Sequence, residues 1–188
     1  MKFTELDIPG CWLIKPDRYG DDRGYFSETF REDLFRKHVG KVDFVQENES
    51  MSVRGVIRGL HFQRGCHAQA KLVRVSRGCV LDVGVDLRPD SPAFGRYVAV
   101  ELSAANGYQL YLPRGMAHGF AVLSDEAVFQ YKVDNYYAPE SEATVRYDDP
   151  SVGVSWPVRP EVRVLSPKDL AGGVFDEMRD VFDEFRGL

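Results

Sequence analysis

The stretch Cys79-Val80-Leu81-Asp82-Val83-Gly84-Val85-Asp86-Leu87 decides the fold class of this chain. Apolar residues alternate along it, so its odd-numbered residues would share one face of an extended strand. Asp82 and Asp86 stand on the opposite face. Because a period of two is the spacing of a strand and not of a helix, the stretch predicts a β-strand.

Similar short runs recur on both sides of this strand, and turn-favouring residues such as Asn106-Gly107 separate them. The further runs expected to be extended are residues 11–14, 56–63, 71–75, 97–102, 108–112, 120–123, 128–133 and 143–147. Many short strands with turns between them are typical of a β-sandwich or barrel. We therefore expect an all-β fold.

Helix is expected in two places only. Residues 32–38 are long enough for two turns. Between Phe175 and Phe185, apolar residues recur at intervals of three and four, which is typical of an amphipathic helix. We therefore expect an amphipathic C-terminal helix whose apolar stripe covers either the barrel or a dimer interface. No repeat or linker divides the 188 residues, so we expect one domain, residues 1–188.

Composition limits the possible partners and compartments. The chain has 24 Lys and Arg against 29 Asp and Glu, a net charge of −5, which gives no general attraction for nucleic acid or an anionic membrane. It shows neither a signal peptide nor a bilayer-spanning apolar stretch. Cys11, Cys66 and Cys79 form no CxxC pair. We expect a soluble, cytoplasmic protein that holds any phosphate-bearing ligand through local cations.

Two polar clusters are candidates for chemistry: residues 58–63 with Lys71 behind them, and residues 113–120 around His118. At strand spacing His61 and Gln63 share a face, whereas Arg58 faces away from His61. Taken alone, His61 is most simply a half-buried histidine bonded to a backbone carbonyl.

Together the two clusters resemble the two-part pattern of the cupin superfamily, whose sites lie inside a double-stranded β-helix barrel. Metal-binding cupins carry His-x-His and a Glu in the first segment, but here Gln63 takes the place of the second histidine. A three-histidine site would need His67. Because imidazole ligands are so few, we expect no metal. A metal-dependent cupin enzyme, with stoichiometric bound metal, stays an alternative.

A narrower resemblance rests on nine runs that occur in a fixed order. They are DRGYFSE (22–28), FVQENES (44–50), VIRGLHFQ (56–63), QAKLVR (69–74), DVGVDLR (82–88), SPAFG (91–95), AHGF (117–120), YK (131–132) with YY (136–137), and LSPKD (165–169). Over roughly residues 3 to 170 the chain is similar to the dTDP-4-dehydrorhamnose 3,5-epimerase family. The resemblance implies a cupin-type jelly roll that inverts C3 and C5 of dTDP-4-dehydro-6-deoxy-D-glucose.

The resemblance also implies four catalytic roles. His61 is the general base and Asp169 orients it, Lys71 faces the developing enolate oxygen, and Tyr131 is the general acid on the opposite face. Since the 4-keto group already makes the neighbouring C–H acidic, we expect an isomerase without metal or organic cofactor.

Substrate binding is implied for a further set: Arg23, Phe26, Glu28, Gln46, Asn48, Arg58, His118 and Tyr137. In the family the run that holds Arg23, Phe26 and Glu28 reaches into the neighbouring subunit's site. We therefore expect a homodimer with an intersubunit active site. An epimerase that inverts only C3 or only C5, and a sugar-nucleotide-binding module without catalysis, stay open as alternatives.

Overall fold

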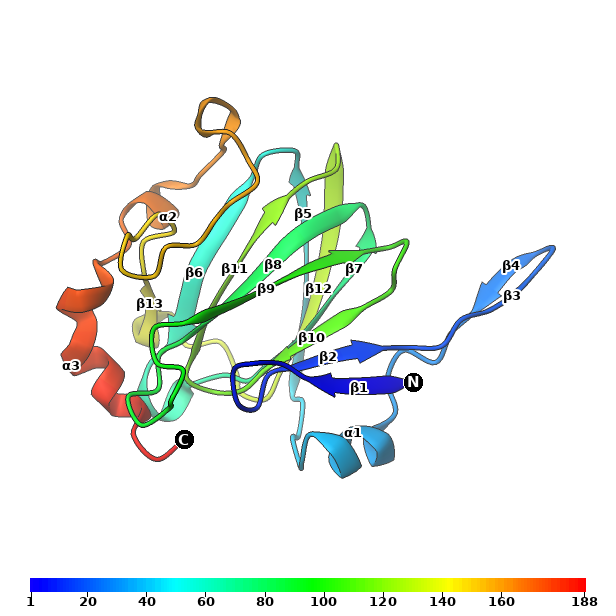
Figure 1. Cartoon of the computed structure of the whole chain (residues 1–188), viewed down its shortest axis with the longest axis horizontal. Coiled ribbons are helices and arrows are strands. Elements are labelled where there is room, and N and C mark those ends of the chain that lie inside the picture. The colour runs from blue at the N-terminus through cyan, green and yellow to red at the C-terminus, as the bar shows by residue number, and fades with distance from the viewer.

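The computed structural model describes residues 1–188, and two antiparallel β-sheets that face each other dominate it (Figure 1). The six-stranded sheet has the order β1-β2-β10-β7-β12-β5, with bounds β1 Lys2–Glu5, β2 Trp12–Lys15, β10 Gln109–Leu112, β7 Lys71–Arg77, β12 Glu126–Val133 and β5 Gln46–Val53. The five-stranded sheet has the order β13-β6-β11-β8-β9, with bounds β13 Glu142–Thr144, β6 Ile57–Gln63, β11 Met116–Val122, β8 Cys79–Asp86 and β9 Tyr97–Ser103. The expected all-β jelly roll is confirmed.

Four strands lie where the sequence indicated none. β1 adds to the edge of the six-stranded sheet, and β3 (Tyr19–Asp21) pairs with β4 (Gly24–Phe26) in a separate hairpin. β5 forms the other edge, pairing with β12 along its whole length. Its sequence QENESMSV is polar because one side of it meets solvent, so it lacks the apolar alternation that predicts a strand.

Apolar side chains form three clusters: one on each face of the five-stranded sheet, and a smaller one around Phe35, where residues 32–38 pack on the six-stranded sheet. Between the sheets lie residues from both, including Val80, Phe120 and Phe129. The outer face packs Val83 and Val85 beneath the C-terminal segment. β8 is therefore buried on both faces, and its aspartates, Asp82 among them, are fully buried. The apparently polar face of β8 is the interior of the barrel.

Both segments expected to be helical contain helix, and the structure adds a short helix, α2 (Pro167–Leu170), and 3₁₀ turns at Gly65–His67, Pro139–Ser141 and Pro160–Val162. α1 spans Glu32–His38, as predicted. The C-terminal segment is not one helix but three consecutive short pieces: a 3₁₀ turn at Phe175–Met178, α3 at Arg179–Phe182 and a 3₁₀ turn at Asp183–Phe185. Its aromatic stripe is nevertheless buried against β6 and β8. None of the helices has the length and apolar character needed to cross a membrane.

Candidate active site

A cavity of about 360 Å³ lies between the two sheets, and polar side chains from both sheets line it. Its lining includes eight residues to which the sequence analysis gave a catalytic or binding role: Gln46, Asn48, Arg58, His61, Lys71, His118, Tyr131 and Tyr137. His61 comes from β6 of the five-stranded sheet, whereas Lys71 and Tyr131 come from β7 and β12 of the six-stranded sheet. The fold therefore places the proposed base and the proposed acid on facing walls.

The prediction that Arg58 faces away from His61 is wrong, since both side chains line the cavity. The reason is a β-bulge in β6. His118 pairs with His61 and Phe120 pairs with Arg58, so between these pairs two residues of β6, Gly59 and Leu60, stand against the single Gly119 of β11. The extra residue reverses the direction of the side chains beyond it.

Gly59 lies inside this bulge, and its lack of a side chain makes the bulge possible. Its φ is +132°, a region that side chains with a Cβ rarely adopt. A Cβ at this position would also stand 2.6 Å from the Gly119 Cα of the neighbouring strand. Glycine therefore allows both the backbone geometry and the close approach of β6 to β11.

Asp169 lies directly behind His61. Its Oδ1 is 2.8 Å from His61 Nε2, at ion-pair distance although off the line of an ideal hydrogen bond, and it also accepts the Gly59 N–H at 2.9 Å. Oδ2 accepts the Ser166 hydroxyl at 2.6 Å, because Asp169 and Ser166 form the capping box of α2 (Pro167–Leu170). A helix cap thus fixes the carboxylate that faces His61.

The Asp169 carboxylate is held in its charged form. Burial would raise its pKa, but the close contact with His61 and the hydrogen bonds from Gly59 and Ser166 outweigh burial and hold the pKa well below the usual range for Asp. A carboxylate that stays charged at this distance favours the protonated form of a neighbouring imidazole.

The half-buried Lys71 lies with the buried Asp82 and His118 in the barrel interior. His118 Nε2 is 2.8 Å from Asp82 Oδ1, while Asp82 Oδ2 has no hydrogen-bond partner. Burial lowers the pKa of His118 and raises that of Asp82, so it favours the uncharged form of each. Burial also lowers the pKa of Lys71 to about 8, and the negative charges of Asp82 and Glu142 offset part of this effect.

Tyr131 lies opposite Asn48 in the β12–β5 ladder and is half buried. Burial, followed by the nearby Glu142 carboxylate, raises the pKa of Tyr131, although Arg58 and a hydrogen bond with Asn48 act in the other direction. The phenol therefore keeps its proton at neutral pH, as a general acid must.

Arg58 and Tyr137 are each held by a polar neighbour. Arg58 Nε donates to Ser52 Oγ at 3.0 Å. The Tyr137 hydroxyl donates to Glu142 Oε2 at 2.8 Å, and Glu142 also forms an ion pair with Lys168. Glu142 and Lys168 line the cavity too.

Arg23, Phe26 and Glu28 do not join this cavity within one chain. The β3–β4 hairpin projects away from both sheets (Figure 1). The Arg23 side chain is 89% exposed and pairs only with Asp21, and Phe26 is 69% exposed. A projecting hairpin with exposed aromatic and cationic side chains offers a surface to another molecule.

The family model described as dTDP-4-dehydrorhamnose 3,5-epimerase matches residues 5–177. The chain belongs to this family. A relative of that name from Escherichia coli K12 is 48% identical over 179 residues, which are 95% of this chain and 96% of the relative.

Solved structures of the family agree with the fold. The epimerase from Elizabethkingia anophelis has 46% identity and a TM-score of 0.92, covering 95% of this chain and 98% of its own. The epimerase from Legionella pneumophila, solved with dTDP-4-keto-L-rhamnose, has 43% identity and a TM-score of 0.92, covering 96% of each chain. The present chain is accordingly an epimerase, an enzyme of the isomerase class.

Among the cavity residues that sequence reasoning did not assign to the site, two are charged, Glu142 and Lys168. Lys168 stands next to Asp169 in the run 165–169, so its position could have been inferred from that run. Glu142 starts a three-residue strand and carries no sequence signal of its own. No group of three or more His, Cys, Asp or Glu side chains in the chain is arranged to hold a metal ion.

Proposed function

We propose that this epimerase converts dTDP-4-dehydro-6-deoxy-D-glucose into dTDP-4-dehydro-L-rhamnose by inverting C3 and C5 through an enolate, without a cofactor. The observation that carries the proposal is the placement of His61 and Tyr131 on facing sheets around one cavity that also holds Lys71. Inversion needs a base on one face of the sugar and an acid on the other. The name of the family and of its close relatives supplies the substrate.

The proposed reaction proceeds in two proton transfers at each carbon. His61 accepts the proton from the carbon next to the ketone, and the electron pair of that C–H bond moves to the carbonyl oxygen to form an enolate. The Lys71 ammonium stabilises the negative oxygen. Tyr131 then donates a proton to the opposite face of the carbon, and the two side chains exchange protons with solvent before the next inversion.

Product analysis tests this proposal. Purified protein is incubated with dTDP-4-dehydro-6-deoxy-D-glucose, and the sugar configuration is followed by NMR. We expect inversion at both carbons. A product inverted only at C3 or only at C5 would assign the chain to the single-carbon alternative, and no conversion would contradict an epimerase of this substrate.

The lowered pKa of Lys71 predicts a fall in activity at alkaline pH. Because its pKa is lowered to about 8, the free enzyme loses this positive charge as the pH rises through that value. Tyr131, with a raised pKa, keeps its proton over the same range. We expect kcat/KM, which reports the free enzyme, to fall above about pH 8. In Lys71→Arg the guanidinium stays charged, so whatever activity remains should lack this alkaline limb. An unchanged limb in that variant would assign it to another group.

We also propose that the protein acts as a homodimer in which the β3–β4 hairpin of one subunit completes the cavity of the other. The hairpin carries Arg23 and Phe26, and Glu28 follows it. All three are far from their own cavity, yet the family resemblance implies that they bind substrate. A cation in this place suits the phosphates of a nucleotide sugar.

Complementation between two variants tests the shared site. Arg23→Ala and His61→Ala are each expected to be poorly active alone. In a mixed dimer, the hairpin of the His61→Ala subunit meets the cavity of the Arg23→Ala subunit, so one site is intact. We expect co-expression to restore about a quarter of the normal activity, since half of the dimers are mixed and each has one intact site. Activity equal to the average of the two variants would contradict the shared site.

A further inference from the structure

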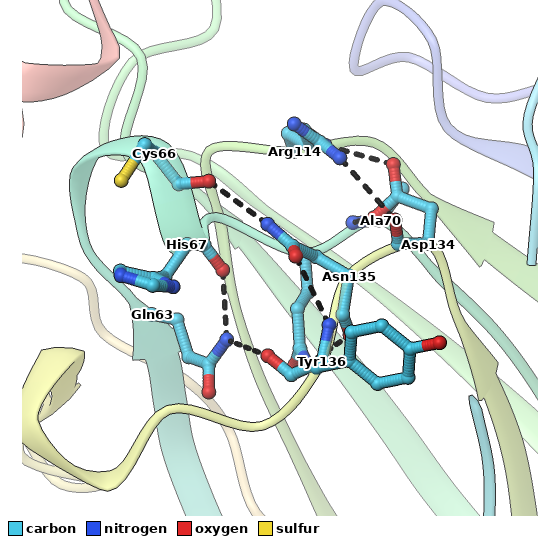
Figure 2. A network of polar contacts seen from close by, with 9 residues as sticks. Gln63, Cys66, His67, Ala70, Arg114, Asp134, Asn135 and Tyr136 are labelled. Atoms are coloured by element: carbon cyan, nitrogen blue, oxygen red, sulfur yellow. Dashed lines mark hydrogen bonds and ion pairs between the residues drawn. The ribbon is translucent and has the colours of Figure 1, made fainter. Parts of the chain in front are cut away.

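Gln63 stands two residues beyond His61 on β6, and its carboxamide is buried although it borders the cavity. Nε2 donates to the carbonyl oxygens of His67 at 2.7 Å and Tyr136 at 3.1 Å, and Oε1 accepts the Ala138 N–H at 2.7 Å. Figure 2 shows the amide nitrogen between the two carbonyl groups. Both of its N–H donors are thus used on backbone, which leaves none for a substrate.

These bonds bracket Tyr137. Gln63 holds the carbonyl before it and the N–H after it, and the Tyr137 N–H itself donates to Gln46 Oε1 at 3.1 Å. Both peptide groups that flank the Tyr137 Cα are therefore fixed by side chains. The ring, in contrast, is exposed and borders the cavity. A fixed backbone with an exposed ring is a preorganised surface for a planar group.

Other bonds join the same two loops, residues 64–70 and 134–138, through residues before Tyr136, and within the second loop the Tyr136 N–H donates to Asn135 Oδ1 at 3.0 Å (Figure 2). Asn135 Nδ2 donates to the Cys66 carbonyl, Gln69 Nε2 to the Asn135 carbonyl, and the Ala70 N–H to Asp134 Oδ1. Arg114 Nε, from the turn before β11, donates to Asp134 Oδ2. Together these bonds fix the start of the second loop, at Asp134 and Asn135. Gln63 is the member of the network that reaches both sides of Tyr137.

We propose that Gln63 is a positioning residue that holds Tyr137 against the planar base of the nucleotide-linked substrate. The class of ligand rests on the proposed function. By fixing the loop during folding, Gln63 reduces the ordering that binding must otherwise impose on it. Loss of Gln63 should therefore weaken binding of the nucleotide and leave the rate of proton transfer at the sugar unchanged.

The substitution Gln63→Met tests this role, because it keeps the side-chain length and removes all three hydrogen bonds. We expect the Kd for dTDP, measured by calorimetry, and the KM for the sugar nucleotide each to rise about 10-fold. We expect kcat to stay within about threefold, since the loss is one of binding shared by ground and transition states. The matched control is Gln130→Met, since Gln130 bonds to the exposed Glu49 outside the cavity. It should change neither constant.

A double-mutant cycle with Tyr137→Ala separates positioning from general loosening of the fold. If Gln63 acts through Tyr137, adding Gln63→Met to Tyr137→Ala should weaken dTDP binding by less than about twofold. Additive effects, an unchanged Kd in Gln63→Met, or a loss of kcat with unchanged Kd would each overturn the proposal. If Gln63→Met does not fold, Gln63→Glu carries the same prediction, because a carboxylate cannot donate to the two carbonyls.

The dTDP measurement does not depend on turnover. A protein that binds dTDP but does not epimerise the sugar would refute the proposed function and leave the test of Gln63 intact. A protein that does not bind dTDP at all would overturn the role of Gln63 as well.

Discussion

Replacing His61 by alanine is expected to lower kcat by about 10²- to 10⁴-fold, the usual contribution of a positioned general base. The neighbouring Asp169 carboxylate is not placed to replace it, because that carboxylate is buried and already accepts hydrogen bonds from Gly59 and Ser166. Initial rates with dTDP-4-dehydro-6-deoxy-D-glucose measure the effect, and dTDP affinity should stay within about threefold, since the role proposed for His61 is proton removal from the sugar.

The substitution Asp169→Asn tests whether His61 depends on the charge of its neighbour. The amide keeps the size of the side chain but not the charge that stabilises the His61 imidazolium. We expect a smaller loss of kcat than in His61→Ala, and the double variant should be no worse than His61→Ala alone, because the two residues act as one unit. The control is His38→Ala, whose imidazole is exposed on α1. Full activity in His61→Ala would refute the assignment of the base.

Tyr131→Phe is expected to reduce inversion by about 10²- to 10⁴-fold as well, because it removes the acid while keeping the ring. Proton removal should then continue without the proton delivery that inverts the carbon. His61 can still remove a proton and return one to the same face, so the substrate should exchange hydrogen with solvent without changing configuration. In D₂O, NMR would show deuterium in unconverted substrate.

Tyr97→Phe provides the matched control for that experiment. Tyr97 lies on β9 and packs against the apolar layer outside the barrel, so losing its hydroxyl should leave inversion unchanged. Inversion at the normal rate in Tyr131→Phe would assign the acid to another residue. Loss of both inversion and exchange would show that Tyr131 is needed already for proton removal.

The strands that build the cavity are largely predictable from sequence because most are buried on at least one face. β8 illustrates this, since its alternation of apolar residues survives in the structure. The alternation does not reveal that the face with Asp82 points into the barrel. The apolar face of β8 is covered by the C-terminal segment, some 90 residues further along the chain, and local sequence does not show that contact. β5 escaped detection for the opposite reason, since an edge strand lined by polar groups has no apolar period.

The site depended on features that local sequence does not contain. Arg58 joins His61 only through the bulge at Gly59, and a regular strand would separate them. Asp169 looks like an ordinary helix-capping acid, and it does cap α2, yet tertiary packing turns the same carboxylate towards His61. The resemblance to a known family supplied this pairing, whereas spacing alone predicted a structural histidine.

Deuterium incorporation during turnover tests the central claim most directly. The unaltered epimerase is incubated with dTDP-4-dehydro-6-deoxy-D-glucose in D₂O, and the product is examined by NMR at C3 and C5. If His61 removes a proton and Tyr131 delivers another from solvent, each inverted carbon should carry one deuterium. An inverted product that retains its original hydrogen at both carbons would contradict the account, because no proton would have passed through the two side chains.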